Sequence, residues 1–176
     1  MEHVVLLDDA GNPIGTAPKH EVHTASTPLH LAFSCHVLDD EGRMLMSRRA
    51  LTKKTWPGVW TNAFCGHPAR DETLADAVHR RAQEELGTRV RDVELVLPTF
   101  RYTARDDSGI VENEICPVHV AMLDAPLSPY AEEVMATAWV PAEALATAVR
   151  EAPFAFSPWL RLQLPGVLVA IREGAR

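Results

Sequence analysis

The sequence predicts an α+β fold in a single domain, with mixed β-sheets sandwiched by helices. Short apolar or alternating runs separated by Asp, Asn and Gly turns indicate strands joined as hairpins. One strongly periodic stretch near the middle and two near the C-terminal end indicate helices. Because the strands come mostly in hairpins, they favour this class over a parallel doubly wound sheet. A length of 176 residues supports one self-sufficient core, so we expect one domain over residues 1–176.

Two hairpins are expected in the N-terminal part of the chain. The first consists of an apolar run that begins at His3, a turn at Asp9–Asn12 and a return strand. The second covers residues 30–50, where the turn sequence DDEG separates an apolar run from a strand of alternating residues.

The clearest helix is predicted from Asp71 to Gly87, with Asp71 as its N-cap and Gly87 just past its last turn. Its apolar residues recur at intervals of four and form one stripe. This stripe consists of Leu74, Val78, Ala82 and Leu86.

The C-terminal half begins with a long hairpin over residues 93–123, around the turn sequence RDDSG. Pro117 cannot donate to a strand ladder, so we expect this strand to lie at an edge or to be irregular there. A short strand over residues 136–141 follows, and Pro141 can start the next helix. The last helix is predicted over residues 157–174, bent or interrupted by Pro165.

Composition and charge narrow the functional class. The net charge of −7 argues against a general nucleic-acid binder, which would be basic overall. Three cysteines, Cys35, Cys65 and Cys116, cannot all pair with one another and fit free thiols in a reducing compartment. The N-terminal residues do not resemble a signal peptide, and no run approaches the ~20 apolar residues of a membrane helix. We expect a cytoplasmic protein that binds neither nucleic acid nor membranes.

The sequence ENE places Glu112 and Glu114 on the same face of a strand, because side chains alternate along a strand. Two such carboxylates repel each other unless a cation or a proton lies between them. A solvated edge is the commoner explanation, but the apolar run that follows indicates burial. Three histidines could join them, namely His23, His30 and His67, although a lone histidine is more often a surface or core residue. If they converge, the mixed nitrogen and oxygen set suits a five- or six-coordinate divalent ion.

Two other stretches carry reactive or charged side chains. In TNAFCGHP, Cys65 and His67 could form a metal corner, a nucleophile beside its base, or an incidental loop pair. Four basic residues lie close together in an acidic protein, either as a solvated loop or as a clamp for a small polyanion, with Lys19 as a further candidate. The four are Arg48, Arg49, Lys53 and Lys54.

The predicted helix resembles the Nudix box, a loop–helix–loop motif that holds a divalent cation beside a diphosphate. The similarity covers about residues 66–88, with two departures: Arg81 stands where that family has Glu, and Thr88 where it has an apolar residue. The loss of one acid indicates the fold without its usual hydrolysis. The alternative is a solvated amphipathic helix with Arg80–Glu84 and Arg81–Glu85 pairs.

Four longer segments, in order from about Lys19 to Trp159, are similar to the type I, Nudix-fold isopentenyl-diphosphate isomerase family. They are HTASTPLHLAFS, RRALTKKTWPGVWTNAFCGHP, FRYTARDDSGIVENEICPV and AFSPW. This combination is more specific than the Nudix-like helix alone. The resemblance implies an enzyme of isoprenoid biosynthesis that interconverts isopentenyl diphosphate and dimethylallyl diphosphate through a tertiary carbocation.

The resemblance also implies roles for individual residues. Glu114, helped by Tyr102, would protonate one face of the alkene, and Cys65, as thiolate, would take a proton from the other face. Trp159 would face the carbocation, which an indole can stabilise by ~2 kcal/mol or more. The implied ligands of a Mn, Mg or Zn ion are His23, His30, His67, Glu112 and Glu114.

At the diphosphate end, the resemblance implies a second ion, Mg²⁺, held by Glu85 and the Cys65 carbonyl. The cations that would bind the phosphates are Lys19, Arg49, Lys53 and Arg81. The partner is thus a small prenyl diphosphate, and we expect a monomer or a weak homodimer. Two alternatives stay open: a Nudix pyrophosphohydrolase of a nucleoside or prenyl diphosphate, and a metal- and prenyl-diphosphate-binding module without turnover.

Overall fold

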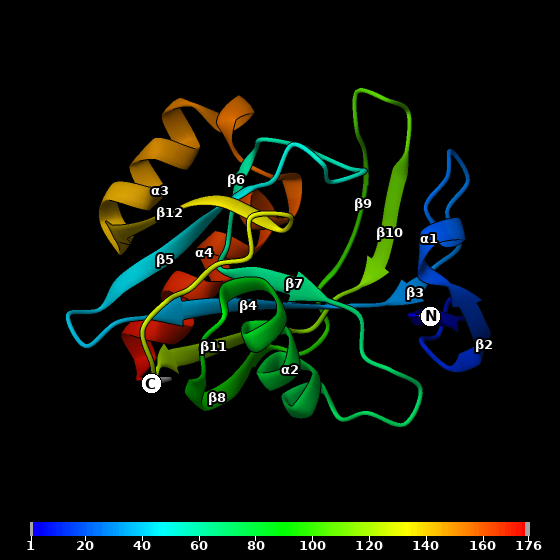
Figure 1. Ribbon diagram of the computed structural model, residues 1–176, viewed down its shortest axis with the longest axis horizontal. Coiled ribbons are helices and arrows are strands. Elements are labelled where there is room, and N and C mark those ends of the chain that lie inside the picture. The colour runs from blue at the N-terminus through cyan, green and yellow to red at the C-terminus, as the bar shows by residue number, and fades with distance from the viewer. Residues whose placement is uncertain (1, 175–176) are drawn as a thin grey trace.

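The computed structural model describes residues 2–174 and confirms a single α+β domain built on two sheets (Figure 1). The predicted domain limits, residues 1 and 176, lie outside the described residues. The smaller sheet has five strands in the order β2-β1-β3-β10-β9 and lies at one end of the molecule (Figure 1). These strands are β1 (His3–Leu7), β2 (Pro13–Pro18), β3 (His30–Leu31), β9 (Arg101–Arg105) and β10 (Val111–Ile115).

The larger sheet has seven strands, with β12-β5-β4-β11-β8 along its main path, β6 paired with β5, and β7 paired with β4. Its strands are β4 (Phe33–Leu38), β5 (Arg43–Arg49), β6 (Trp60–Thr61), β7 (Phe64–Gly66), β8 (Val90–Leu97), β11 (Val118–Leu123) and β12 (Val134–Pro141). The helical elements are α1 (Lys19–Val22), α2 (Leu74–Leu86), α3 (Ala142–Glu151), η1 (Pro153–Ala155) and α4 (Pro158–Glu173).

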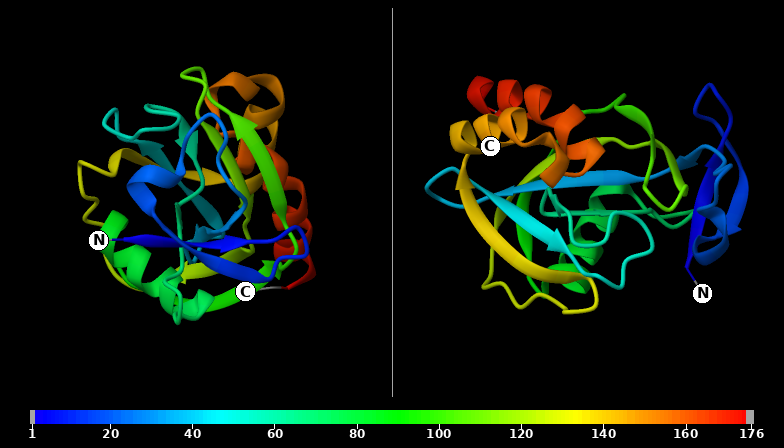
Figure 2. Two further views of the ribbon diagram at one scale, coloured as in Figure 1. Left: turned by 90° about the vertical axis from the view of Figure 1, so that its right-hand side faces the viewer. Right: turned by 90° about the horizontal axis from the view of Figure 1, so that it is seen from above.

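Helices cover both faces of the larger sheet (Figure 2). The stripe predicted on α2 is confirmed, since Val78, Ala82 and Leu86 are fully buried against one face, with Leu74 packed beside them. On the other face, side chains of α3 and α4 pack against Met44 and other strand residues. The sheet is therefore the middle layer of a sandwich, as the sequence predicts.

Two strands pass from the smaller sheet into the larger one. The chain leaves β3 and enters β4 at Ala32, and it leaves β10 and enters β11 at Cys116–Pro117. The two crossings run side by side, because β10 pairs with β3 and β11 pairs with β4, both in parallel. The same pair of strands thus carries residues into both sheets where the sheets meet.

Three expectations need correction. The long hairpin predicted over residues 93–123 is divided: β9 and β10 pair in the smaller sheet, while β8 and β11 pair in the larger one. Pro117 marks the division, which agrees with the irregularity expected there. The last helix continues through Pro165 without interruption.

The third correction concerns the start of α2. Its N-cap is Thr73, not Asp71, and the Thr73 hydroxyl accepts a hydrogen bond from the backbone nitrogen of Asp76 at 3.1 Å. The predicted end is confirmed, because Gly87 has the left-handed φ of 57°. A side chain there would also collide with the Ser128 carbonyl oxygen, which lies 2.3 Å from an added Cβ.

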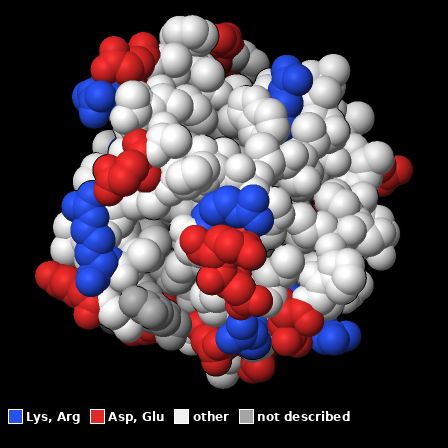
Figure 3. All heavy atoms as spheres, turned by 90° about the vertical axis from the view of Figure 1, so that its left-hand side faces the viewer, with Lys and Arg blue, Asp and Glu red and all other residues white. Residues whose placement is uncertain are grey.

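No helix among residues 2–174 is long and apolar enough to span a membrane. On the face of the molecule opposite the smaller sheet, basic side chains lie in small groups, most of them beside acidic ones (Figure 3).

The cap of α2 can be tested by substitution. We expect Thr73→Ala to lower the free energy of unfolding by about 1 kcal/mol, because it removes the acceptor for a helix N–H group. Asp71→Ala is the matched control and should change it much less. Urea unfolding of both variants measures the difference, and a larger loss for Asp71→Ala would contradict the assigned cap.

Candidate functional site

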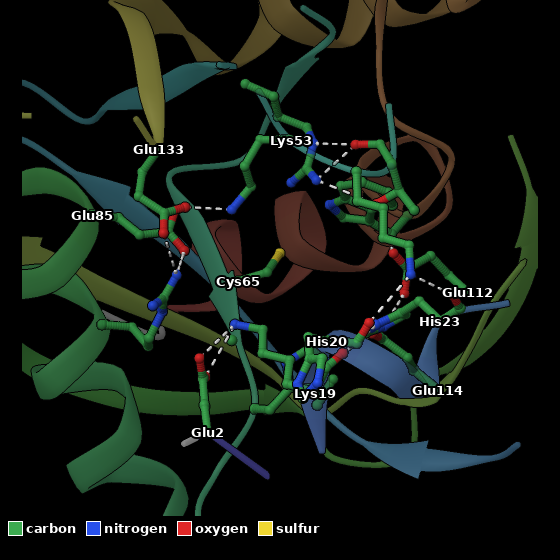
Figure 4. Close-up of a pocket in the computed structure, with 18 of the residues that line it drawn as sticks. Glu2, Lys19, His20, His23, Lys53, Cys65, Glu85, Glu112, Glu114 and Glu133 are labelled. Atoms are coloured by element: carbon green, nitrogen blue, oxygen red, sulfur yellow. Dashed lines mark hydrogen bonds and ion pairs between the residues drawn. The ribbon is translucent and has the colours of Figure 1, made fainter. Parts of the chain in front are cut away.

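The predicted site residues gather around one cavity of about 680 Å³ beside the junction of the two sheets (Figure 4). Only one of them, His30, does not line it, and that residue is fully buried beside the others. Those that line the cavity are Lys19, His23, Arg49, Lys53, Cys65, His67, Arg81, Glu85, Tyr102, Glu112, Glu114 and Trp159.

Strand pairing in the smaller sheet aligns three of these residues. Glu114 on β10 pairs with Tyr102 on the neighbouring β9 and with His30 on β3 on its other side. Paired residues in a sheet project to the same face, so the three side chains form one row. Glu112, two residues before Glu114, belongs to the same face.

The ring of His30 directs a lone pair at Glu114. Its Nδ1 lies 2.9 Å from the Pro28 carbonyl oxygen, which can only accept, so Nδ1 carries the proton. Its Nε2 lies 3.4 Å from Oε1 of Glu114 but makes no hydrogen bond. Burial lowers the pKa of His30, but the Glu114 carboxylate outweighs this and raises it. The position thus favours a positive charge between the two groups.

His23 repeats the arrangement with Glu112. Its Nδ1 faces the Lys19 carbonyl oxygen at 3.4 Å, and its Nε2 lies 3.1 Å from Oε2 of Glu112. Neither Nε2 nor Oε2 has a hydrogen-bond partner, although both are buried. The other Glu112 oxygen accepts from the Thr55 hydroxyl at 2.8 Å, which fixes the carboxylate. Lys54 holds this segment from outside by donating to the His23 carbonyl oxygen at 2.7 Å.

His67 enters the cluster on the loop before α2. Its Nε2 is 3.3 Å from Oε1 of Glu114, while its Nδ1 is buried without a partner. Burial lowers the pKa of His67 to about 4, so the ring is neutral and can offer a lone pair. Arg80 on α2 fixes the loop by donating to the His67 carbonyl oxygen at 3.1 Å and pairing with Glu72.

These residues fit a divalent cation. One ligand atom from each of His23, His30, His67 and Glu114 lies within 4.8 Å of the others, and all four residues are buried. Lone pairs that face carboxylate oxygens without hydrogen bonds are costly in a protein interior unless a cation compensates them. Glu112 adjoins this group through its contact with His23.

A second group of charges lines the cavity nearer α2 (Figure 4). Each of three predicted phosphate-binding cations contacts a carboxylate. Lys19 lies 3.0 Å from Glu2, Lys53 pairs with Glu133, and Arg81 pairs with Glu85. Arg81 and Glu85 are both buried, so α2 brings a positive and a negative group into the cavity one helical turn apart.

Gly66 makes room for this arrangement. A Cβ at Gly66 would lie 2.7 Å from Cγ of Arg81 and 3.0 Å from the ring of Phe33. The absence of a side chain lets α2 approach β7, so that Arg81 reaches the cavity between Cys65 and Glu85.

The thiol of Cys65 and the phenol of Tyr102 face the same cavity. Burial raises the pKa of Cys65 to about 11, and the Glu114 carboxylate acts in the same direction. These surroundings favour the protonated thiol, whereas the sequence led us to expect a thiolate. Burial also raises the pKa of Tyr102 well above its usual range. In contrast, the imidazoles of His30 and His67 outweigh burial and hold the pKa of Glu114 well below its usual range.

Trp159 forms the aromatic wall. Its ring centroid lies 6.0 Å from that of Tyr102 and 5.3 Å from that of Trp56. The guanidinium of Arg49 lies 5.4 Å from the Trp159 ring and donates to backbone carbonyls of Thr55 and Trp56. Arg49 is therefore part of the wall as well as a cation of the cavity.

Comparison with protein families and with curated relatives identifies the chain. A family model described as a NUDIX domain matches residues 28–160. The "Isopentenyl-diphosphate Delta-isomerase" of Clavibacter sepedonicus is 63% identical over 164 residues, which cover 93% of this chain and 86% of that protein. The protein of the same name from Agromyces mediolanus is 65% identical over 162 residues, covering 92% and 79% of the two chains.

The chain belongs to the isopentenyl-diphosphate Delta-isomerase family and has a NUDIX fold.

Solved structures agree on the fold of this isomerase family member. A Deinococcus radiodurans crystal structure superposes with a TM-score of 0.72 at 15% identity, covering 93% of this chain and 98% of that one. At that identity the likeness concerns the fold alone. The predicted family and fold are confirmed, and membership favours an isomerase over both the pyrophosphohydrolase and the non-catalytic module.

Several residues of the cavity were missed in the sequence. Thr55 and Glu133 lie in or beside loops, and their contacts with Glu112 and Lys53 join positions far apart in the chain. Asn62 lies within the TNAFCGHP stretch and was not singled out. Its side chain lies 3.4 Å from the Cys65 sulfur, and its signal was a polar residue in an otherwise apolar run.

The metal cluster makes different demands on its two neighbours in that stretch. We expect His67→Asn to lower the affinity for Mn²⁺ by at least about 10-fold, because it removes a ligand. Cys65→Ser should keep that affinity, since the thiol contacts Ser34 and Asn62 but no member of the cluster. Mn²⁺ titration of both apo-variants, monitored by electron paramagnetic resonance, measures the difference. Equal loss in the two variants would make the thiol a ligand.

Proposed function

We propose that the chain catalyses the reversible interconversion of isopentenyl diphosphate and dimethylallyl diphosphate. The observation that carries the proposal is that a thiol and a carboxylate from different sheets face one cavity beside a metal-binding cluster. Cys65 comes from β7 in the larger sheet and Glu114 from β10 in the smaller one. An alkene between them would have a proton-transfer group on each face.

Moving the double bond requires one proton at C4 and removal of one from C2. In the form favoured by these surroundings, Cys65 holds a proton and Glu114 is ionised. Cys65 then donates to C4 and Glu114 accepts from C2, after which the proton has changed sides. The order expected from the sequence, with Glu114 as donor, applies to the opposite form of the pair, which the reverse reaction starts from. Tyr102, neutral and next to Glu114 in the sheet, assists that carboxyl group.

His23, His30, His67, Glu112 and Glu114 would hold a divalent ion, of which Mn, Mg and Zn are the candidates. A bound ion would fix the orientation of Glu114 and strengthen its acid form. Trp159 would shield the carbocation from water with its indole face, as an aromatic ring attracts a cation. The ring is almost fully buried, and its position is fixed by the surrounding aromatic residues.

The diphosphate is assigned to the cations nearer α2, namely Lys19, Arg49, Lys53 and Arg81. Since Glu2 and Glu133 neutralise two of them, substrate must compete with these carboxylates. Mg²⁺ that arrives with the diphosphate would be held by Glu85 and the Cys65 carbonyl and would add positive charge there. In this arrangement Arg81 binds phosphate where Nudix hydrolases have an acid, so the diphosphate is retained.

The partner is a small prenyl diphosphate, and the net charge of −7 supports no role in nucleic-acid binding. We place the enzyme in the cytoplasm because its three cysteines are free thiols. A monomer or a weak homodimer remains the expectation.

The direct test of the proposal is incubation of the purified protein and Mg²⁺ with isopentenyl diphosphate, followed by NMR. We expect the two methyl signals of dimethylallyl diphosphate to appear. Release of inorganic phosphate or monophosphate from nucleoside or prenyl diphosphates, without any isomer, would support the hydrolase in its place. Binding of the substrate without product would support the non-catalytic module.

The two ion sites can be separated through Glu85. We expect Glu85→Gln to raise the Mg²⁺ concentration needed for half-maximal rate by about 10-fold or more, because it removes a ligand of the diphosphate-linked ion. The ion in the His/Glu cluster should stay. Glu84→Gln is the matched control, since Glu84 is half-exposed on the same helix and lies outside the cavity. Loss of the cluster's ion from substrate-free Glu85→Gln would contradict the two-site assignment.

A further inference from the structure

Four polar side chains are buried in the core around and behind Cys65. Ser34, Asn62 and Gln163 have no exposed surface, and His36 is 1% exposed. None belongs to the metal cluster or to the diphosphate-binding group. Polar groups in a core cost stability unless they are hydrogen-bonded, so the contacts that satisfy them show what they hold in place.

Ser34 supports the thiol from β4. It pairs with Cys65 on β7, and its Oγ lies 3.3 Å from the Cys65 sulfur and 3.4 Å from the Cys116 sulfur. Gln163 on α4 donates to the same Oγ at 2.9 Å. Oε1 of Gln163 in turn faces Nε2 of His36 at 3.1 Å.

The donors in this chain run in one direction, toward the sulfur. Burial lowers the pKa of His36 to about 4, so the ring is neutral. Because the Gln163 oxygen can only accept, His36 Nε2 carries the ring proton and donates it. The Gln163 amide then donates to Ser34, and the Ser34 hydroxyl proton is left for a neighbouring sulfur.

Asn62 supports the thiol from the other side. Its amide nitrogen donates to the carbonyl oxygens of Cys35 at 3.0 Å and Phe64 at 2.8 Å and lies 3.4 Å from the Cys65 sulfur. Its side-chain oxygen accepts from the indole N–H of Trp159 at 3.0 Å. One buried amide therefore joins the sulfur and the aromatic wall.

Both supports are braced by α4. Trp159 and Gln163 are four residues apart, so they project from one face of the helix. One contacts Asn62 and the other Ser34, the two residues that touch the Cys65 sulfur.

We propose that Ser34, Asn62 and Gln163 are positioning residues that hold the Cys65 sulfur at a fixed place relative to Trp159 and the substrate. This inference rests on the proposed function, because it assumes that Cys65 transfers the proton. Proton transfer to carbon depends on placement, and a shift of about 1 Å in a reacting group can cost about 100-fold in rate. The network supplies that placement from residues that need not touch substrate.

Ser34→Ala and Gln163→Met test the proposal separately and together. Each removes one link at small change of volume, and either folded variant decides the first outcome. We expect kcat to fall by about 10- to 100-fold and KM to change by less than about two-fold, because the cations of the cavity are untouched. Mn²⁺ affinity should be unchanged. The double variant should lose no more than the poorer single variant, since both residues act through one hydroxyl.

Thr88→Val is the matched control for loss of a buried hydroxyl. Thr88 is 1% exposed, donates to the Ala125 carbonyl oxygen at 2.7 Å, and does not line the cavity. It should lower stability without lowering kcat at a temperature where all the proteins are folded.

Unchanged kcat in folded Ser34→Ala or Gln163→Met, a rise in KM that accounts for the loss, or additive effects in the double variant would overturn the inference. Failure of the proposed function would look different. The wild-type protein would then form no isomer, or Cys65→Ser would retain full activity.

Discussion

Three imidazoles and two carboxylates, buried together where the two sheets meet, set the constraint on which the rest of the structure depends. At His23 and His30, backbone carbonyls take the Nδ1 proton and leave the other ring nitrogen facing a carboxylate without a hydrogen bond. Such an arrangement is unfavourable alone and favourable around a cation. The surrounding contacts, from Thr55 to Glu112 and from Arg80 to the His67 loop, hold the ligands in this geometry. The two apolar layers on either side of the larger sheet provide the stability that such a cluster requires.

The paired crossing of two strands explains why the metal cluster and the thiol lie next to each other. His30 and Ser34 are four residues apart on one crossing strand pair, and Glu114 and Cys116 are two apart on the other. Before the crossing, the strands present the metal ligands, and after it they support Cys65 on the neighbouring β7. The two ends of the proposed proton transfer are thus set by the same backbone segments. A change that altered the crossing would disturb both at once.

Sequence reasoning succeeded where local periodicity fixes geometry. The alternation of a strand places Glu112 and Glu114 on one face, and the spacing of four on α2 defines its buried stripe. Resemblance to the family supplied the residues that gather around the cavity. Reasoning from sequence failed where competing local or distant contacts decide the outcome. Thr73 caps α2 because its hydroxyl reaches Asp76, although Asp71 offers an equally suitable side chain two residues earlier. The division of the hairpin at Pro117, the Glu133 partner of Lys53 and the support of Cys65 by α4 all join distant parts of the chain, and no spacing rule reports them.

The central claim is that the double bond moves by addition of one proton and removal of another by groups that exchange with water. Isomerisation in deuterated water tests this most directly, with deuterium located by NMR in dimethylallyl diphosphate after a single turnover. We predict deuterium in the methyl group formed from C4, because Cys65 and Glu114 line an open cavity and regain their protons from solvent between turnovers. Product that contains no solvent deuterium would contradict the account and would indicate an internal hydrogen shift in its place.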